Sequence, residues 1–198
     1  LGRLEGIVRR EVTERLAGAT VDASALAGER GRTFFTYDGP PEDVLNLRSV
    51  ENVFAAVAQF DGLPADDTGP ETIRAWAATS HLAEAVAVHA QVHGPRESPS
   101  FRCTSKRFGE HAFASMDIMA AAGAGIVDRC GWRVDLEGYD YDIRVDVEDD
   151  RCTIGLRITP VSLRHRGRVA HVAASLNPTL GYAMCVLSDP RPGEVFDL

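Results

Sequence analysis

The segment from residue 141 to residue 158 constrains the fold of this chain most, because its apolar residues recur at every second position. Acidic and basic side chains alternate there with Ile143, Val145 and Val147. After Asp149 and Asp150 the alternation resumes with Cys152, Ile154, Leu156 and Ile158. Successive side chains of a strand point to opposite faces, so the pattern predicts a β-hairpin with one buried and one solvated face.

Charge is distributed unevenly across this hairpin. Residues 133 to 150 carry two arginines and eight acids, whereas residues 151 to 168 carry five arginines and no acid. A turn at residues 149 and 150 would place Glu148 opposite Arg151 and Asp142 opposite Arg157. Opposite charges on facing strands attract, so we expect cross-strand ion pairs at these positions.

The remaining sequence predicts a mixture of helices and strands, which indicates an α+β fold built of α/β sandwiches. Helices are expected over residues 4–16, from Glu71 to about Val92, and over 115–130 with Ser115 as N-cap and Asp117 in the first turn. Strands are expected over 31–39, 49–60 and 101–106, and a short helix over 40–47.

Composition excludes several classes of protein. The 198 residues are 44% hydrophobic and 25% charged, which is typical of a globular protein, and no apolar run is long enough to span a bilayer. We therefore expect a cytoplasmic protein without a membrane partner.

The four cysteines show no paired spacing, so reduced thiols are expected. The net charge of −8 leaves room for a local basic face.

The densest basic cluster is the segment L-R-H-R-G-R at residues 163 to 168, which contains Arg164, His165, Arg166 and Arg168. The predicted hairpin pairs cannot reach these arginines. A guanidinium binds phosphate oxygens through two parallel N–H groups, so the cluster is a candidate RNA contact. A solvated basic loop remains an equal alternative on charge pattern alone.

A second basic cluster consists of Arg102, Lys106, Arg107 and His111. Arg102 and Lys106 share one face of the predicted strand 101–106, so both could meet the same nucleic-acid backbone. The nearby phenylalanines could stack on bases, although aromatic residues at this spacing more often belong to a core.

Several other patterns carry no recognisable chemistry. His89 and His93 are four residues apart on a predicted helix, but no third ligand accompanies them, and we expect no metal site. Gly123 and Gly125 lie inside a predicted helix, where a dinucleotide-binding loop does not form. No catalytic triad or carboxylate pair is evident, so no catalytic residue is assigned.

With these residues in view, the chain resembles the N-terminal part of a THUMP-domain RNA methyltransferase. The segments S-F-R-C-T-S-K-R-F-G-E-H-A-F-A-S-M-D-I and Y-D-I-R-V-D-V-E-D-D-R-C-T-I-G-L-R-I-T resemble the start and the terminal hairpin of the THUMP core. The first part of the chain is similar to the ferredoxin-like domain that precedes THUMP. The end, from S-L-N-P-T-L-G-Y to P-G-E-V-F-D-L, resembles the helix and first strand of a Rossmann-like methyltransferase domain.

This resemblance implies a ferredoxin-like domain over residues 1–95, a THUMP RNA-binding domain over 96–168, and a linker helix with the first strand of a catalytic domain over 169–198. It assigns Thr179 and Asp197 to an incomplete site for S-adenosylmethionine. It implies a tRNA partner docked by the acceptor stem and 3′ end, guanine-N2 methylation, and no DNA partner. We therefore expect a fragment of a larger enzyme, with a catalytic domain in cis, that neither catalyses methyl transfer nor holds the cofactor by itself.

Two alternatives from other classes remain open. The chain could be a stand-alone THUMP adaptor that binds RNA without a catalytic domain, although the methyltransferase-like tail argues against it. It could also be an acidic α+β domain that binds protein, its arginines serving only as solvated surface. RNA binding that weakens steeply with added salt would favour an RNA-binding function over the protein-binding domain.

Overall fold

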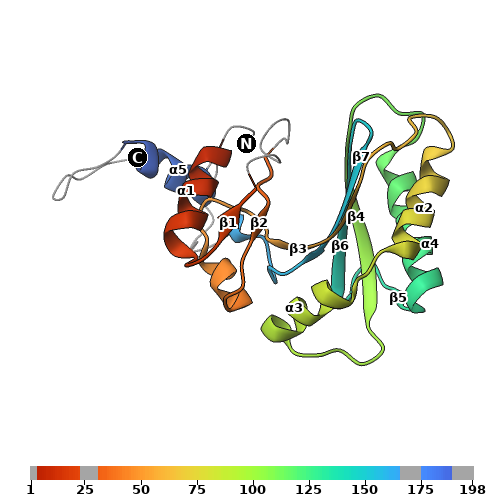
Figure 1. Cartoon of the computed structure of the whole chain (residues 1–198), viewed down its shortest axis with the longest axis horizontal. Helices are drawn as coiled ribbons and strands as arrows, with labels where there is room; N and C mark the ends of the chain where they lie inside the picture. The colour runs from red at the N-terminus through yellow and green to blue at the C-terminus, as the bar shows by residue number, and fades with distance from the viewer. Residues whose placement is uncertain (1–3, 23–30, 166–174, 189–198) are drawn as a thin grey trace. The chain divides into compact units, whose positions relative to one another are not determined.

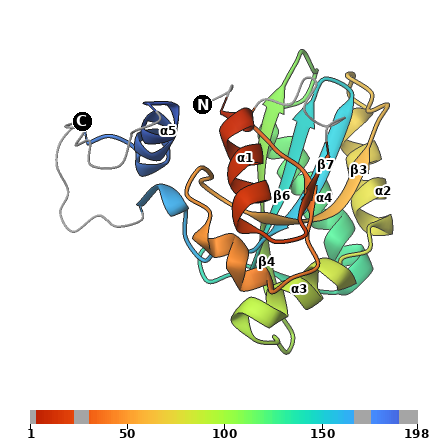
Figure 2. The ribbon, with the colours of Figure 1, turned by 60° about the vertical axis from the view of Figure 1, so that its left-hand side comes forward.

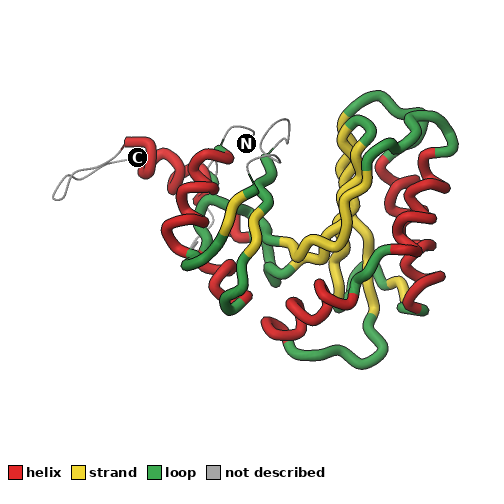
Figure 3. Tube along the Cα trace, in the orientation of Figure 1, coloured by secondary structure: helices red, strands yellow, loops and turns green. Residues whose placement is uncertain are grey.

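The computed structural model describes residues 4–22, 31–165 and 175–188 of the chain. The chain divides into two compact units. One unit is the continuous segment Phe54–Ile158, and the other combines Leu1–Val53 with Thr159–Leu198. Figures 1 and 3 show the helices and strands of each unit. The mixed helix-and-strand architecture confirms the predicted fold class.

The unit Phe54–Ile158 is built on a five-stranded sheet with the spatial order β3-β7-β6-β4-β5. Strand β7 is antiparallel to both of its neighbours, whereas β4 is parallel to β6 and to β5. The strands are β3 (Phe54–Phe60), β4 (Ser100–Phe108), β5 (Arg133–Val134), β6 (Tyr141–Glu148) and β7 (Arg151–Arg157).

The predicted hairpin is confirmed as β6 and β7. Glu148 lies opposite Arg151 across the turn at residues 149 and 150. Asp149 adopts a positive φ of 53° there, a conformation that aspartate tolerates better than most residues. The expected ion pair between Asp142 and Arg157 is present, with 3.1 Å between Oδ2 and Nη1.

One hydrophobic core lies between this sheet and three helices, α2 (Gly69–Thr79), α3 (Ala83–His93) and α4 (Ser115–Cys130). In Figure 1 the sheet is seen along its edge, with α2 and α4 side by side against it. The sheet contributes the apolar members of the alternating pattern, and the helices contribute one side chain per turn. The fully buried core side chains include Ile73, Phe101, Ile118, Ala122, Ile126, Ile143, Val145, Val147, Cys152 and Leu156.

The close contact of α2 with α4 requires a glycine. A Cβ atom added to Gly125 would lie 2.3 Å from the carbonyl oxygen of Arg74 and 2.9 Å from the Cβ of Ala77. Both approaches are shorter than van der Waals contact. The glycines at 123 and 125 therefore belong to a helix, as expected, and Gly125 lies where the two helix backbones meet.

The helix expected from Glu71 to Val92 is wrong as a single element, because the chain forms α2 and α3 instead. Ser80 adopts an extended conformation (φ −67°, ψ 139°), and its hydroxyl donates to the carbonyl of Trp76 at 2.8 Å. A serine side chain bonded to the last turn replaces the next backbone bond and ends the helix. The alanine-rich composition on both sides concealed this break.

The helix over residues 115–130 is confirmed with a different start. Ala114 occupies the N-cap position that we expected for Ser115. The Asp117 carboxylate accepts the N–H of Ala114 at 2.7 Å, so the acidic residue in the first turn has the predicted stabilising place.

The predicted boundary between residues 95 and 96 falls inside the unit Phe54–Ile158. Strand β3 pairs with β7 over six positions, although they are about a hundred residues apart in sequence, and α2 and α3 pack on the same sheet. The strand expected over 49–60 thus exists as β3 but completes the sheet of the following segment. Local sequence does not reveal such a distant partner.

The second unit contains α1 (Glu5–Arg15), β1 (Thr20–Val21), β2 (Phe35–Thr36), the 3₁₀ helices η2 (Pro41–Asn46) and η3 (Leu163–His165), and α5 (Pro178–Ser188). Strands β1 and β2 pair antiparallel. Figure 2 shows α1 beside the segment that carries η2. The buried carboxylate of Glu11 joins them, because it accepts the N–H groups of Arg48 and Ser49 at 2.8 and 2.7 Å.

Glu51 connects the two stretches of chain that make up this unit. Its carbonyl accepts the N–H of Leu163 at 2.7 Å, and its carboxylate accepts from the amide of Asn177 at 2.7 Å.

Among the described residues, no helix combines the length and the apolar character needed to cross a membrane.

Candidate nucleic-acid interface

The sheet face opposite the hydrophobic core is lined with charged and polar side chains, and we call it the polar face. Strands β4 and β6 are paired in register with Arg102 opposite Asp142 and Lys106 opposite Asp146. On strands β4, β6 and β7 this face carries five basic and three acidic side chains, in a protein whose total charge is negative. It is lined by Arg102, Thr104, Lys106, Asp142, Arg144, Asp146, Glu148, Arg151, Thr153 and Arg157.

Asp142 is the centre of this face. Its Oδ2 accepts from Arg102 at 2.8 Å and from Arg157 at 3.1 Å, and its Oδ1 accepts from the hydroxyl of Thr104 at 3.1 Å. The carboxylate is 7% exposed, and the side chains of Arg102 and Arg157 are 29% and 16% exposed. One carboxylate therefore holds two guanidinium groups in place, and this cluster keeps a net positive charge.

Arg102 also stacks on an aromatic ring. Its guanidinium carbon lies 3.9 Å above the ring centroid of Tyr139, a geometry in which the ring face attracts the cation. The structure thus places Arg102, a predicted RNA contact, in a fixed orientation on the polar face. Lys106, the other predicted member on this face, is exposed, and its backbone N–H donates to Asp146 at 2.7 Å.

Arg107 and His111 lie at the end of β4, beside the turn at residues 149 and 150. Arg107 Nη1 donates to the carbonyl of Gly109 at 3.2 Å and lies 3.4 Å from His111 Nδ1. His111 Nε2 lies 2.7 Å from the carbonyl oxygen of Asp149. The structure therefore brings these two predicted residues together, at the sheet end rather than on the polar face.

The cluster at residues 163 to 168 lies only partly within the described chain. Arg164 and His165 belong to η3, and the side chain of Arg164 is exposed. Arg166 and Arg168 lie outside the described residues. Their assignment as RNA contacts stays a prediction.

Several residues of the polar face were not among the candidate RNA contacts, although Asp142 and Arg157 were expected as an ion pair. Arg144 and Arg157 lie on the polar face, and Arg144 pairs with Asp146 at 2.6 Å between Nε and Oδ1. Tyr139 and Asp142 orient Arg102. The parallel pairing of β4 with β6 brings these groups together, and the alternating pattern shows which face a residue lines but not which strand lies beside it.

The histidine pair at positions 89 and 93 has a structural explanation. His89 is 6% exposed, its ring meets that of Tyr141 edge-on at 4.9 Å, and burial lowers its pKa to about 4. His93 Nε2 is 2.7 Å from the carbonyl of Ile158. No group of three or more potential metal ligands occurs among the described residues.

The predicted cofactor residues do not form a site in the described part of the chain. Thr179 is buried in the first turn of α5, and its N–H donates to the side chain of Asn177 at 3.0 Å. Asp197 lies outside the described residues. The assignment of Thr179 and Asp197 to a site for S-adenosylmethionine therefore stays a prediction.

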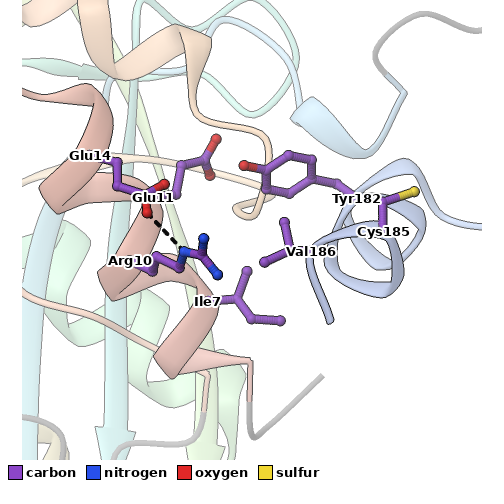
Figure 4. A pocket seen from close by; sticks show the side chains of 7 residues that line it. All are labelled: Ile7, Arg10, Glu11, Glu14, Tyr182, Cys185 and Val186. Atoms are coloured by element: carbon purple, nitrogen blue, oxygen red, sulfur yellow. Dashed lines mark hydrogen bonds and ion pairs between the residues drawn. The ribbon is translucent and has the colours of Figure 1, made fainter. Parts of the chain in front are cut away.

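A cavity of about 250 Å³ lies between α1 and α5 (Figure 4). Charged groups on its α1 side are already paired, because Arg10 Nε donates to Glu14 at 2.8 Å and Glu11 accepts backbone N–H groups. Tyr182 and Cys185 line the α5 side. The polar side chains that line this cavity therefore do not indicate a particular ligand.

Comparison with known proteins gives this geometry a family context. The THUMP domain family matches residues 82–157, which lie within the unit Phe54–Ile158. The human tRNA (guanine(6)-N(2))-methyltransferase THUMP3 is 32% identical over 97 residues, which are 48% of this chain and 19% of that protein. The tRNA (guanine(6)-N2)-methyltransferase of Thermus thermophilus is 35% identical over 94 residues, 48% of this chain and 28% of that enzyme.

Solved structures extend the similarity to nearly the whole chain. TrmN from Thermus thermophilus superimposes with a TM-score of 0.72 and 27% identity over 97% of this chain and 53% of that one. SMU.472, a putative methyltransferase solved with SAH, gives a TM-score of 0.73 over 98% and 48% of the two chains; its 16% identity shows the fold alone. The chain thus spans about half the length of these structures.

Proposed function

We propose that this chain, which contains a THUMP domain and is related to tRNA guanine-N2-methyltransferases, is the tRNA-binding module of such an enzyme. The observation that carries the proposal is the THUMP match at residues 82–157, together with 31–35% identity to enzymes that all bear this activity in their names. The resemblance inferred from the sequence is thereby confirmed. Methylation of guanine N2 in this chain's own parent protein remains part of the proposal.

The polar face supports nucleic-acid docking by its charge and its geometry. Strands β4, β6 and β7 carry five basic and three acidic side chains on this face, and Arg102 is held by both Asp142 and Tyr139. Contacts from fixed arginines to phosphates carry no base information, so this surface would recognise the shape and charge of an RNA backbone. We infer that it docks the acceptor stem and 3′ end of tRNA.

The division of labour follows from the chemistry of methyl transfer. A sulfonium methyl group needs little acid or base assistance, so precise placement of the target amine supplies much of the rate. A rigid docking module that determines which guanine reaches the catalytic domain would serve this end. S-adenosylmethionine would be bound by that catalytic domain, joined in cis, and the residues described in this chain would contribute tRNA binding.

Equilibrium binding of tRNA to the 198-residue chain tests the proposal. Binding should weaken steeply as salt rises from 50 to 200 mM, since phosphate contacts release counterions. Replacing Arg164, Arg166 and Arg168 with glutamate should weaken binding by about tenfold or more without unfolding the protein. Affinity for duplex DNA equal to that for tRNA would overturn the assignment, as would the absence of tRNA binding at low salt.

The mass of the native gene product tests the link to a catalytic domain. A product near twice the 21.4 kDa of this chain would support a methyltransferase with its catalytic domain in cis. A product of 21.4 kDa would instead support an adaptor that binds RNA for a separate partner.

A further inference from the structure

The contacts of His111 indicate which of its two ring nitrogens donates and which accepts. A backbone carbonyl can only accept hydrogen bonds, so the 2.7 Å contact to Asp149 requires a proton on His111 Nε2. In the neutral ring Nδ1 is then an acceptor, and the group facing it at 3.4 Å is Nη1 of Arg107, which can only donate. Both ring nitrogens of His111 are therefore engaged inside the protein.

The backbone around His111 is held by three meeting segments. Gly109 has a φ of 95°, which strains any other residue, and a Cβ there would lie 3.2 Å from the backbone Cα of Asp149, so glycine suits this approach. The N–H of Asp149 donates to Phe108 at 3.1 Å, and the N–H of Ala112 donates to Ala65 at 2.8 Å. The acceptors that face Arg107 thus lie on a fixed loop.

These acceptors engage one nitrogen of Arg107 and leave the rest of its guanidinium available. Nη1 donates to Gly109 and His111, whereas Nε and Nη2 make no hydrogen bond to any described residue. The Nε–Nη2 edge supplies two parallel donors, which match two oxygens of a phosphate. An arginine that is oriented before binding loses less side-chain entropy when it binds.

We propose that His111 is a positioning residue, which orients Arg107 so that the Nε–Nη2 edge of Arg107 contacts a tRNA phosphate. This inference rests on the proposed function and gives His111 a different role from the direct RNA contact predicted from the sequence. A histidine that contacted phosphate itself would need a ring nitrogen that is not already bonded within the protein.

A double-mutant cycle in tRNA affinity tests the inference on the full 198-residue chain. Arg107→Ala should weaken binding about tenfold and reduce the salt slope by about one, as expected for one lost phosphate contact. His111→Ala should weaken binding about threefold to tenfold in the wild-type background and less than twofold in the Arg107→Ala background. His111→Gln, whose amide offers one acceptor and donors, should recover part of the loss, and His81→Ala, at an exposed histidine, should change nothing.

Each outcome of the cycle is decisive. An effect of His111→Ala that persists in the Arg107→Ala background would show that His111 acts on RNA directly and would overturn the inference. An unchanged affinity of Arg107→Ala would overturn it as well. Absence of tRNA binding by the wild-type chain would instead refute the proposed function.

A measurement without RNA keeps the positioning role testable in that last case. In ¹⁵N NMR of arginine guanidinium groups, Arg107 should show slowed rotation about its Nε–Cζ bond. The signal is assigned by its loss in Arg107→Lys. Rotation that becomes fast in His111→Ala would support the positioning contact, and rotation unaffected by that substitution would refute it.

Discussion

Replacing Asp142 with asparagine should destabilise the unit Phe54–Ile158 while strengthening its binding to tRNA. Asparagine keeps the shape and one acceptor oxygen but removes the charge that holds Arg102 and Arg157. Each ion pair becomes a bond from a charged donor to a neutral acceptor. An exposed pair contributes about 0–1 kcal/mol, and breaking a buried pair costs about 3–5 kcal/mol, so for these two partly exposed pairs together we expect a loss of about 2 kcal/mol. For a unit of this size we expect a fall in Tm of roughly 8 °C.

The change in tRNA affinity has the opposite sign. The substitution removes one negative charge from the polar face and leaves two guanidinium groups without their carboxylate, so phosphate attraction should rise and binding should tighten severalfold. Thermal unfolding followed by circular dichroism measures the first effect, and salt-dependent tRNA binding measures the second.

A matched control is available at the exposed pair of Asp61 with Arg151, whose side chains are 68% and 39% exposed. Asp61→Asn should cost less than about 0.5 kcal/mol, because a solvated pair contributes little. If Asp142→Asn proved as mild as this control, the ion cluster would not stabilise the unit. If it left the tRNA affinity unchanged, the polar face would not be the binding surface.

Three further predictions concern the interior. Burial lowers the pKa of His89 in the folded state to about 4, below its ordinary 6.5, so the unfolded chain binds a proton there first as pH falls. The free energy of unfolding should therefore drop by about 2 kcal/mol between pH 7 and pH 5. Denaturant titrations of His89→Leu should show a smaller drop. Burial raises the pKa of the Cys103 thiol to about 12, so iodoacetamide at pH 7.5 should label the exposed Cys185 first. Mass spectrometry measures the order of labelling, and faster labelling of Cys103 would contradict its burial. Gly125→Ala should lower the free energy of unfolding by about 2 kcal/mol or more, because the new Cβ would overlap the backbone of α2. Gly123→Ala, whose Cβ would meet only one sulfur atom at 4.0 Å, should stabilise α4 by about 0.5–1 kcal/mol. Urea unfolding measures both, and equal effects would refute the contact between the two helices.

The parts of the fold that the sequence predicted correctly are those determined by local periodicity. Ile143, Val145 and Val147 alternate with charged residues, and this period of two is enough to predict β6 and to pair it with β7 across a short turn. The helix over residues 115–130 likewise follows from its own residues and from the glycine at 131 that ends it. In both cases the deciding interactions join residues that are close in sequence.

The parts that the sequence did not predict depend on contacts between distant residues. Strand β3 finds its partner β7 about a hundred residues later, which moved it into a different unit from the one expected. Arg102 was predicted as an RNA contact from its charge, but its pairing with Asp142 follows from the parallel alignment of β4 with β6. His111 was assigned by the same charge pattern, and only its bond to the turn at Asp149 reveals its occupied ring nitrogens.

Hydroxyl-radical footprinting of tRNA by the 198-residue chain shows which part of the tRNA the chain contacts. We expect the negatively charged module to bind with roughly micromolar affinity at low salt, so the titration should extend to about 100 μM. We expect protection of the acceptor stem and the 3′ end, and weaker protection when Lys106 is replaced with glutamate. Protection confined to other parts of the tRNA, or none at the highest concentration, would contradict it.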